Sequence, residues 1–100
     1  MLADLSRLQK AGGLLCSVCT GALVLAWAGA LQGRRATTHH AYRERLAAYC
    51  QVVDQRVVTG GNVITAAGVS ASPDLGLALL ERFYGSETAR QVARRIECHW

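Results

Sequence analysis

The sequence has little proline, few aromatic residues and no dense run of charge of one sign. One proline among 100 residues that are 51% hydrophobic excludes a disordered tail, a collagen-like repeat and a polar low-complexity segment. The net charge is +4, and the basic residues are scattered from Arg7 to Arg95 without interleaved aromatics. This pattern indicates an ordinary solvated surface and predicts no nucleic-acid contacts from this chain. The length predicts one small domain.

The cysteines are too few for a small secreted disulfide scaffold. They stand at positions 16, 19, 50 and 98. Cys16 and Cys19 have the CxxC spacing of zinc sites and of thioredoxin-like redox motifs. A zinc site would need a second CxxC or a spaced histidine pair. No second CxxC follows, and His39 and His40 are adjacent, so their rings tend to diverge. We therefore expect no metal and no cofactor, with Cys16 in the core. Unpaired thiols suit a reducing compartment, so we expect a cytoplasmic protein.

Residues 11–33 carry no charge, which raises the alternatives of a membrane span or a secretory signal. Four glycines interrupt the run, and it divides into a strand-length piece over 14–18 and a helix-length piece over 20–31. A buried strand followed by a buried helix has the same hydropathy as a membrane span. We favour the strand and helix, and expect no membrane association.

The remaining sequence alternates between strand and helix patterns. Short strands are predicted over 36–39 and on both sides of a glycine turn at 59–62, and a short exposed helix over 42–49. A helix is predicted from Ser72 to Tyr84, and a last helix follows Ser86. Strands alternating with helices predict a layered α/β domain with a mostly parallel sheet.

Cys19 stands where a buried strand is expected to turn sharply into an apolar helix. Glycine follows two residues later, as in a nucleophile elbow, with cysteine in place of serine. At the start of a helix, free N–H groups stabilise a thiolate and can hold an oxyanion. The alternative is that Cys19 is a small buried hydrophobic residue.

Four separated motifs, in this order, carry a family resemblance. They are residues 17–26 (SVCTGALVLA), 33–39 (GRRATTH), 53–58 (VDQRVV) and 62–71 (NVITAAGVSA). With these motifs the chain resembles the DJ-1/PfpI family of the class I glutamine amidotransferase-like superfamily. It is most similar to the isonitrile hydratase branch and to the amidase-like domains of AraC-type regulators. The resemblance implies a flavodoxin-like three-layer sandwich with a nucleophile elbow.

The resemblance also implies roles for three residues. Cys19 matches the family's reactive elbow cysteine, Thr20 the pocket residue after it, and His39 a histidine that some members place near the thiol. The implied reaction is hydration of a small isonitrile to an N-substituted formamide. A non-enzymatic ligand-binding or cysteine redox-sensing module is the alternative, and the residues leave open whether the chain is an enzyme. His39 can also be a histidine that is simply hydrogen-bonded at the end of a strand.

The resemblance covers residues 14–97, so we expect residues 1–100 to form a C-terminal portion of the family domain. The acidic residue that the family places beside the cysteine belongs to the N-terminal portion and has no counterpart here. We therefore expect weak or no activity from this chain. We also expect a partner for its apolar surfaces, either a second copy or the missing N-terminal half.

Overall fold

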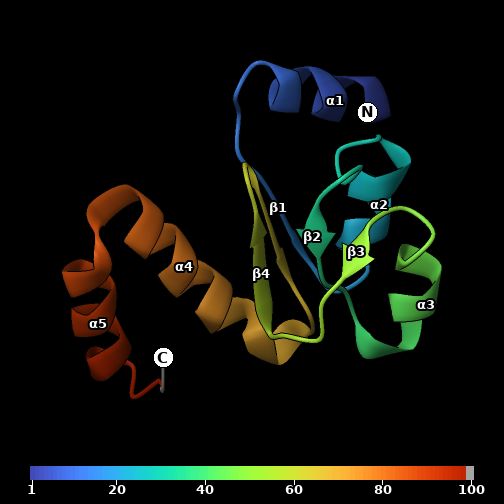
Figure 1. Ribbon diagram of the computed structural model, residues 1–100. Coiled ribbons are helices and arrows are strands. Elements are labelled where there is room, and N and C mark those ends of the chain that lie inside the picture. The colour runs from blue at the N-terminus through green and yellow to red at the C-terminus, as the bar shows by residue number, and fades with distance from the viewer. Residues whose placement is uncertain (99–100) are drawn as a thin grey trace.

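The computed structural model describes residues 1–98, which form a layered arrangement of short strands and helices (Figure 1). The helices are α1 (Leu2–Lys10), α2 (Gly21–Trp27), α3 (Arg43–Leu46), α4 (Ser72–Tyr84) and α5 (Ser86–Arg95). The strands are β1 (Leu15–Val18), β2 (Arg35–Ala36), β3 (Gln51–Val52), β4 (Val57–Gly60) and β5 (Val63–Ala66).

The central sheet has the strand order β1-β5-β4. β1 runs parallel to β5, and β4 joins β5 in an antiparallel hairpin. The tight turn between β4 and β5 contains Gly61, whose φ of 68° lies in the left-handed region that glycine adopts without strain. All four residues of β5 are buried, because β5 is the middle strand and both faces of the sheet are covered. This burial explains why three of the four residues of β5 are apolar; the exception is Thr65.

Two apolar clusters lie on opposite faces of the central sheet. Val63 belongs to a cluster with α2 and Leu15, whereas its neighbour Ile64 belongs to a cluster with Leu75 of α4. Successive side chains of a strand point to opposite faces, which produces this division. With helices on both sides and two of the three strand pairings parallel, the chain has the predicted α/β fold with a mostly parallel sheet.

The second sheet is smaller than the sequence predicted. Only Arg35–Ala36 of the expected strand over 36–39 pairs, in parallel with Gln51–Val52. The strand ends there because the Thr37 N–H donates to the side-chain oxygen of Thr65, 2.8 Å away, and not to a neighbouring strand.

The expected helix over 42–49 is also shorter. The chain forms a 3-10 turn over His40–Tyr42 and then α3, a single helical turn. The Nδ1 atom of His39 accepts a hydrogen bond from the Ala41 N–H at 3.2 Å and so caps the 3-10 turn. The side chain of His39, rather than a strand neighbour, therefore directs the chain into the turn.

The uncharged run is divided between β1 and α2, and α2 ends at Trp27 rather than at Leu31. Gly29 then turns the chain with a φ of 79°. In the described part of the chain, no helix is both long enough and apolar enough to cross a bilayer.

The expectation that Cys16 lies in the core is wrong: its side chain is exposed, because β1 is at the edge of the central sheet.

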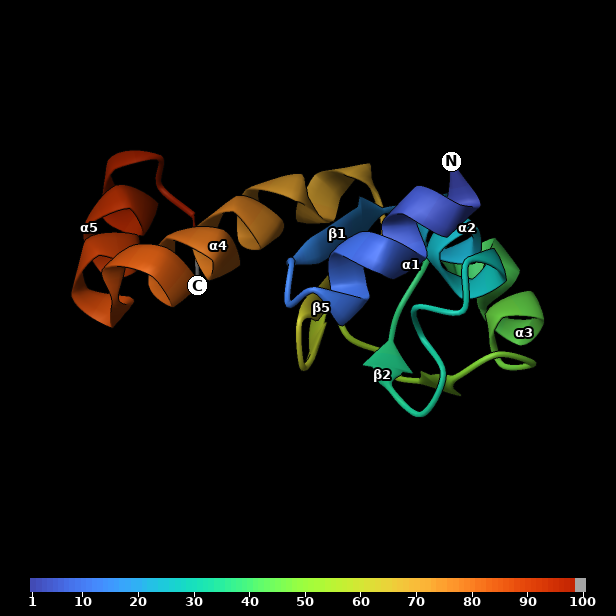
Figure 2. The same cartoon turned by 90° about the horizontal axis from the view of Figure 1, so that it is seen from above.

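The two C-terminal helices project from the sheet (Figures 1 and 2). The first turns of α4 cover one face of β5 and β4, where Leu75 is buried, and the helix then runs away from the strands. α5 folds back against α4 through Ala89 and Ala93, which are buried. Phe83 and Tyr84, at the far end of α4, remain largely exposed.

Candidate functional site

Cys19 occupies a sharp turn between β1 and α2. Its φ of 56° is left-handed, a conformation that costs a non-glycine residue about 1–2 kcal/mol. Two hydrogen bonds hold it there. The Cys19 N–H donates to the carbonyl oxygen of Ala66 at 3.1 Å, and the hydroxyl of Thr38 donates to the Cys19 carbonyl oxygen at 2.7 Å. The backbone of Cys19 is thus fixed by β5 on one side and by the segment after β2 on the other.

Thr38 is fully buried, and its hydroxyl holds the Cys19 turn. We expect Thr38→Val to lower the free energy of unfolding by about 1 kcal/mol, because the Cys19 carbonyl loses its donor while the side-chain volume stays similar. Urea unfolding followed by circular dichroism measures this loss. Thr38→Ser keeps the hydroxyl and is the control. A valine variant at least as stable as the serine variant would contradict the role given to this hydrogen bond.

A cavity of about 580 Å³ opens beside the Cys19 turn, next to residues that directly follow β5. Its walls include the two sequence-predicted residues Cys19 and His39. The other lining residues are His40, Arg43, Asp54, Gln55, Arg56 and the segment 67–71. In open α/β sheets, ligands bind outside the carboxyl ends of the parallel strands, which is where this cavity lies.

His39 is half-buried in the cavity wall, and its ring is held in place from two sides. Its Nδ1 accepts the hydrogen bond from Ala41, and its ring stacks on the exposed His40 with centroids 4.3 Å apart. A neutral ring that accepts at Nδ1 carries its proton on Nε2. His39 is therefore a hydrogen-bonded histidine at a turn, and it also brings a donor to the cavity that contains Cys19.

Thr20, the third sequence-predicted residue, lies next to the cavity but not in its wall. It is exposed and stands at the N-cap position of α2, with no capping hydrogen bond from its side chain. The structure thus brings Cys19 and His39 together at one cavity and leaves the Thr20 side chain outside that group.

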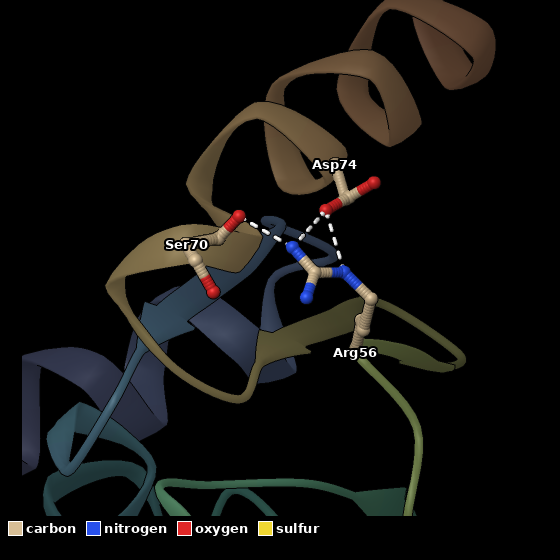
Figure 3. Close-up of polar contacts among 3 residues, drawn as sticks. All are labelled: Arg56, Ser70 and Asp74. Carbon is tan, nitrogen blue, oxygen red and sulfur yellow. Dashed lines mark hydrogen bonds and ion pairs between the residues drawn. The ribbon is translucent and has the colours of Figure 1, made fainter. Parts of the chain in front are cut away.

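Arg56 and Asp74 form an ion pair at the edge of the cavity that sequence reasoning missed (Figure 3). Nε and Nη2 of Arg56 donate to one carboxylate oxygen of Asp74 at 3.0 and 2.9 Å, and Nη2 also donates to the carbonyl oxygen of Ser70. Asp74 lies in the first turn of α4. The two residues are 18 positions apart, so no local pattern in the sequence signals the pair.

The Arg56–Asp74 pair is asymmetric: the Arg56 side chain is 60% exposed and that of Asp74 only 13%. We expect Arg56→Met to lower the free energy of unfolding by about 1–3 kcal/mol, because it leaves a buried carboxylate without its donors. Asp74→Asn should restore part of this loss in the double variant. Thermal unfolding of the four proteins measures the coupling. If the losses of the two single variants simply add in the double variant, Arg56 and Asp74 are not coupled and the prediction is wrong.

Cys16 and Cys50 differ from an activated thiol. Although the Cys16 side chain is exposed, neighbouring protein atoms partly desolvate its sulfur and raise the pKa of Cys16 above its ordinary value of 9.0, a shift that nearby Arg82 opposes. Burial likewise raises the pKa of Cys50. At neutral pH both groups therefore hold less thiolate than an ordinary cysteine, and they serve as internal references in labelling experiments.

Within residues 1–98, no group of three or more His, Cys, Asp or Glu side chains is placed to hold a metal ion.

The fold and the site define an α/β domain with a cysteine on a strained turn between a parallel strand and a helix, facing a cavity. The sequence profile of the DJ-1/PfpI family matches residues 2–82, and the chain belongs to this family.

The relatives include enzymes, regulators and DJ-1 proteins. Over 96 residues the chain is 46% identical to the isonitrile hydratase of Pseudomonas putida, a match that covers 94% of this chain and 42% of that protein. It is 39% identical over 98 residues to the HTH-type transcriptional regulator CdhR of Pseudomonas aeruginosa, covering 92% of this chain and 28% of the regulator. The crystal structure of Drosophila melanogaster DJ-1β superposes with a TM-score of 0.87 at 30% identity, covering 97% of this chain and 53% of the other. The chain thus spans about half the length, or less, of these relatives.

Proposed function

We propose that Cys19 is the nucleophile of a cysteine-dependent hydration of a small molecule, with an isonitrile as the model substrate. The observation that carries the proposal is the placement of Cys19: a left-handed turn fixed by two hydrogen bonds, facing a cavity of about 580 Å³. The similarity to isonitrile hydratase supplies the reaction.

The proposed reaction balances with water as the only co-reactant. The sulfur of Cys19 bonds to the terminal carbon of the isonitrile, and that carbon takes the proton of the thiol, which gives a thioimidate. Water then adds to the same carbon and the carbon–sulfur bond breaks. The thiol is regenerated, and the nitrogen gains a proton to give an N-substituted formamide. His39 borders the cavity, and histidine is the side chain that most often acts in general acid–base catalysis, so it is the residue proposed to assist these transfers.

The test is the appearance of formamide from an aryl isonitrile in the presence of this chain. We expect turnover slower than that of the P. putida enzyme by about 10²–10⁴-fold, the usual contribution of general acid–base catalysis, because no carboxylate among residues 1–98 forms a hydrogen bond with Cys19. Cys19→Ser should abolish turnover, whereas Cys50→Ser should not. Turnover that survives Cys19→Ser, or a chain that neither turns over the isonitrile nor forms a covalent adduct with it, would overturn the proposal.

A second candidate is a non-enzymatic module that binds a small ligand or senses oxidants through Cys19. The similarity to the regulator CdhR favours this class, since its name gives a transcriptional and not a catalytic activity. In the oxidant-sensing form, peroxide transfers one oxygen to the Cys19 thiolate, giving sulfenic acid, and is itself reduced to water. Mass spectrometry after dilute peroxide tests this form: oxidation of Cys19 before Cys50 supports it, and oxidation of Cys50 first excludes it.

A further inference from the structure

We propose that the cavity binds a small substrate that carries a carboxylate, and that Arg43 holds that carboxylate. The inference rests on the proposed function in one respect: the bound molecule is the substrate of Cys19. The charged residues of the cavity wall suggest which molecule it is. Two arginines, Arg43 and Arg56, and one acid, Asp54, line the cavity, together with His39 and His40. This lining is richer in hydrogen-bond donors than in acceptors, which suits an anion.

Arg56 is not the residue that binds the ligand. Two of its three guanidinium nitrogens already donate to Asp74, and one of these also donates to the Ser70 carbonyl. The charge of Arg56 is therefore balanced by a carboxylate that is itself buried, and the guanidinium holds the start of α4 to the loop before β4 (Figure 3).

Arg43 is the arginine of the cavity wall whose hydrogen-bond donors are available to a ligand. Its Nη2 lies 3.0 Å from Asp54, but the Asp54 side chain is 83% exposed and that of Arg43 only 32%. A pair with one partner in water contributes little and is easily exchanged for another anion. The Nε of Arg43 is buried and has no hydrogen-bond partner within the described residues. Because a ligand in the cavity cannot reach a buried atom, the donors that Arg43 offers are those of its terminal nitrogens, and Nη2 becomes available when a ligand replaces the exposed Asp54.

The geometry of the guanidinium narrows the ligand class. The two terminal nitrogens of Arg43 form a planar fork that matches the two oxygens of a carboxylate. His39 adds a donor at the same cavity, because its Nδ1 is occupied as an acceptor for Ala41 and its proton lies on Nε2. The expected substrate therefore has its reactive carbon at Cys19 and a carboxylate at Arg43.

The first experiment compares two alkylating reagents of similar size, anionic iodoacetate and neutral iodoacetamide, with Cys19 adducts quantified by peptide mass spectrometry. We expect Arg43→Gln to slow iodoacetate at Cys19 by roughly two- to fivefold, the effect of losing one partly exposed ion pair. The rate with iodoacetamide should change less than twofold, because this reagent carries no charge. Arg45→Gln is the matched control: it removes the same charge from an exposed residue of α3 that lies outside the cavity wall.

Arg43→Lys keeps the charge without the fork, and should fall between the wild-type protein and Arg43→Gln. If Arg43→Gln slows both reagents equally, or if Arg45→Gln has the same effect, Arg43 is not the anion site and the inference is overturned.

The second experiment separates the substrate class from the reaction. An aryl isonitrile with a para carboxylate is compared with its para carboxamide. A preference for the carboxylate that is lost in Arg43→Gln supports both the inference and the proposed function. Equal turnover of the two supports the function and overturns the carboxylate preference. If neither is hydrated while the reagent selectivity at Cys19 persists, the proposed reaction fails and the anion site remains.

Discussion

Gly60→Ala should unfold a large part of the protein or prevent its accumulation. Gly60 ends β4, where the backbone of β2 crosses close to it. A Cβ atom at this position would lie 2.5 Å from the carbonyl oxygen of Arg35 and 3.4 Å from its backbone nitrogen. Both are main-chain atoms held by the β2–β3 pairing, so no side-chain rotation relieves the clash. We expect a loss of about 3 kcal/mol or more, which is a large fraction of the stability of a small domain.

Thermal unfolding by circular dichroism measures this effect, and at this size the expected loss lowers Tm by roughly 12–24 °C. Gly76→Ala is the matched control. Gly76 lies within α4, and a Cβ there meets no atom within 4 Å, so the same substitution should stabilise the protein by about 0.5–1 kcal/mol. A Gly60→Ala protein with the wild-type Tm would show that β2 and β4 do not approach each other as described.

The neighbouring Gly61 gives an intermediate case. Its φ of 68° is unfavourable for alanine, but the atom that a Cβ would meet is the end of the flexible Arg34 side chain. That side chain donates to the Gly60 carbonyl at 2.8 Å, and Gly61→Ala displaces this contact rather than a backbone. We therefore expect Gly76→Ala to be the most stable of the three variants, Gly61→Ala to be intermediate and Gly60→Ala to be the least stable, according to the atoms that each new methyl group contacts.

Periodicity and turn residues were sufficient to predict the parts of the fold whose cause is local. The apolar strand before Cys19, the hairpin around Gly60 and Gly61, and the helix from Ser72 to Tyr84 all lie close to where the sequence placed them. The elbow at Cys19 was also predicted, because a strand, a nucleophile and a following glycine occur within a few residues of each other.

The features that were missed depend on contacts between distant residues. The strand at 36–39 stops early because Thr37 donates to Thr65, 28 positions away, and Asp74 meets Arg56 across the cavity edge. Arg43 was expected on an exposed helix, and it is half-buried because the short α3 turns it towards the cavity that also contains Cys19. None of these contacts can be predicted from a local sequence pattern, because each depends on how separate segments of the chain pack together.

The exposed edge of β1 leads to the second large effect, self-association of the chain. The Leu15 N–H donates to Asn62, just before β5, and the Cys19 N–H donates to Ala66, the last residue of β5. The alternation of a strand therefore turns the amide and carbonyl of Cys16 towards the opposite edge. Among the strands that the structure describes, only β5 pairs with β1. The edge is apolar: Leu14 and Val18 are half-exposed on either side of the exposed Cys16. An apolar edge strand without charge or proline is a template for another strand.

We propose that a second copy of the chain pairs with this edge, and we expect a concentration-dependent dimer in size-exclusion chromatography with light scattering, run in the presence of a reductant. Covering a few hundred Å² of apolar surface contributes several kcal/mol at ~25 cal/mol per Å², and the hydrogen bonds of the new strand pairing add to this gain. The entropic cost of association offsets much of the gain, so we expect the dimer to form only at high protein concentration. Pairing of the same strand in both copies gives a closed two-fold dimer, and not an open chain of subunits.

Cys16→Lys tests the edge directly, because it places a charge at the centre of β1 in both copies, where the two lysines repel each other and lose hydration on pairing. The position is already exposed, so the substitution disturbs no core contact. We expect this variant to remain a monomer up to concentrations at least tenfold above those at which the wild-type chain dimerises. Gln91→Lys adds the same charge on the exposed face of α5, far along the chain from the sheet, and should dimerise like the wild-type chain. A wild-type chain that stays monomeric with a cooperative thermal transition, or a Cys16→Lys variant that still dimerises, would show that β1 does not form the contact between copies.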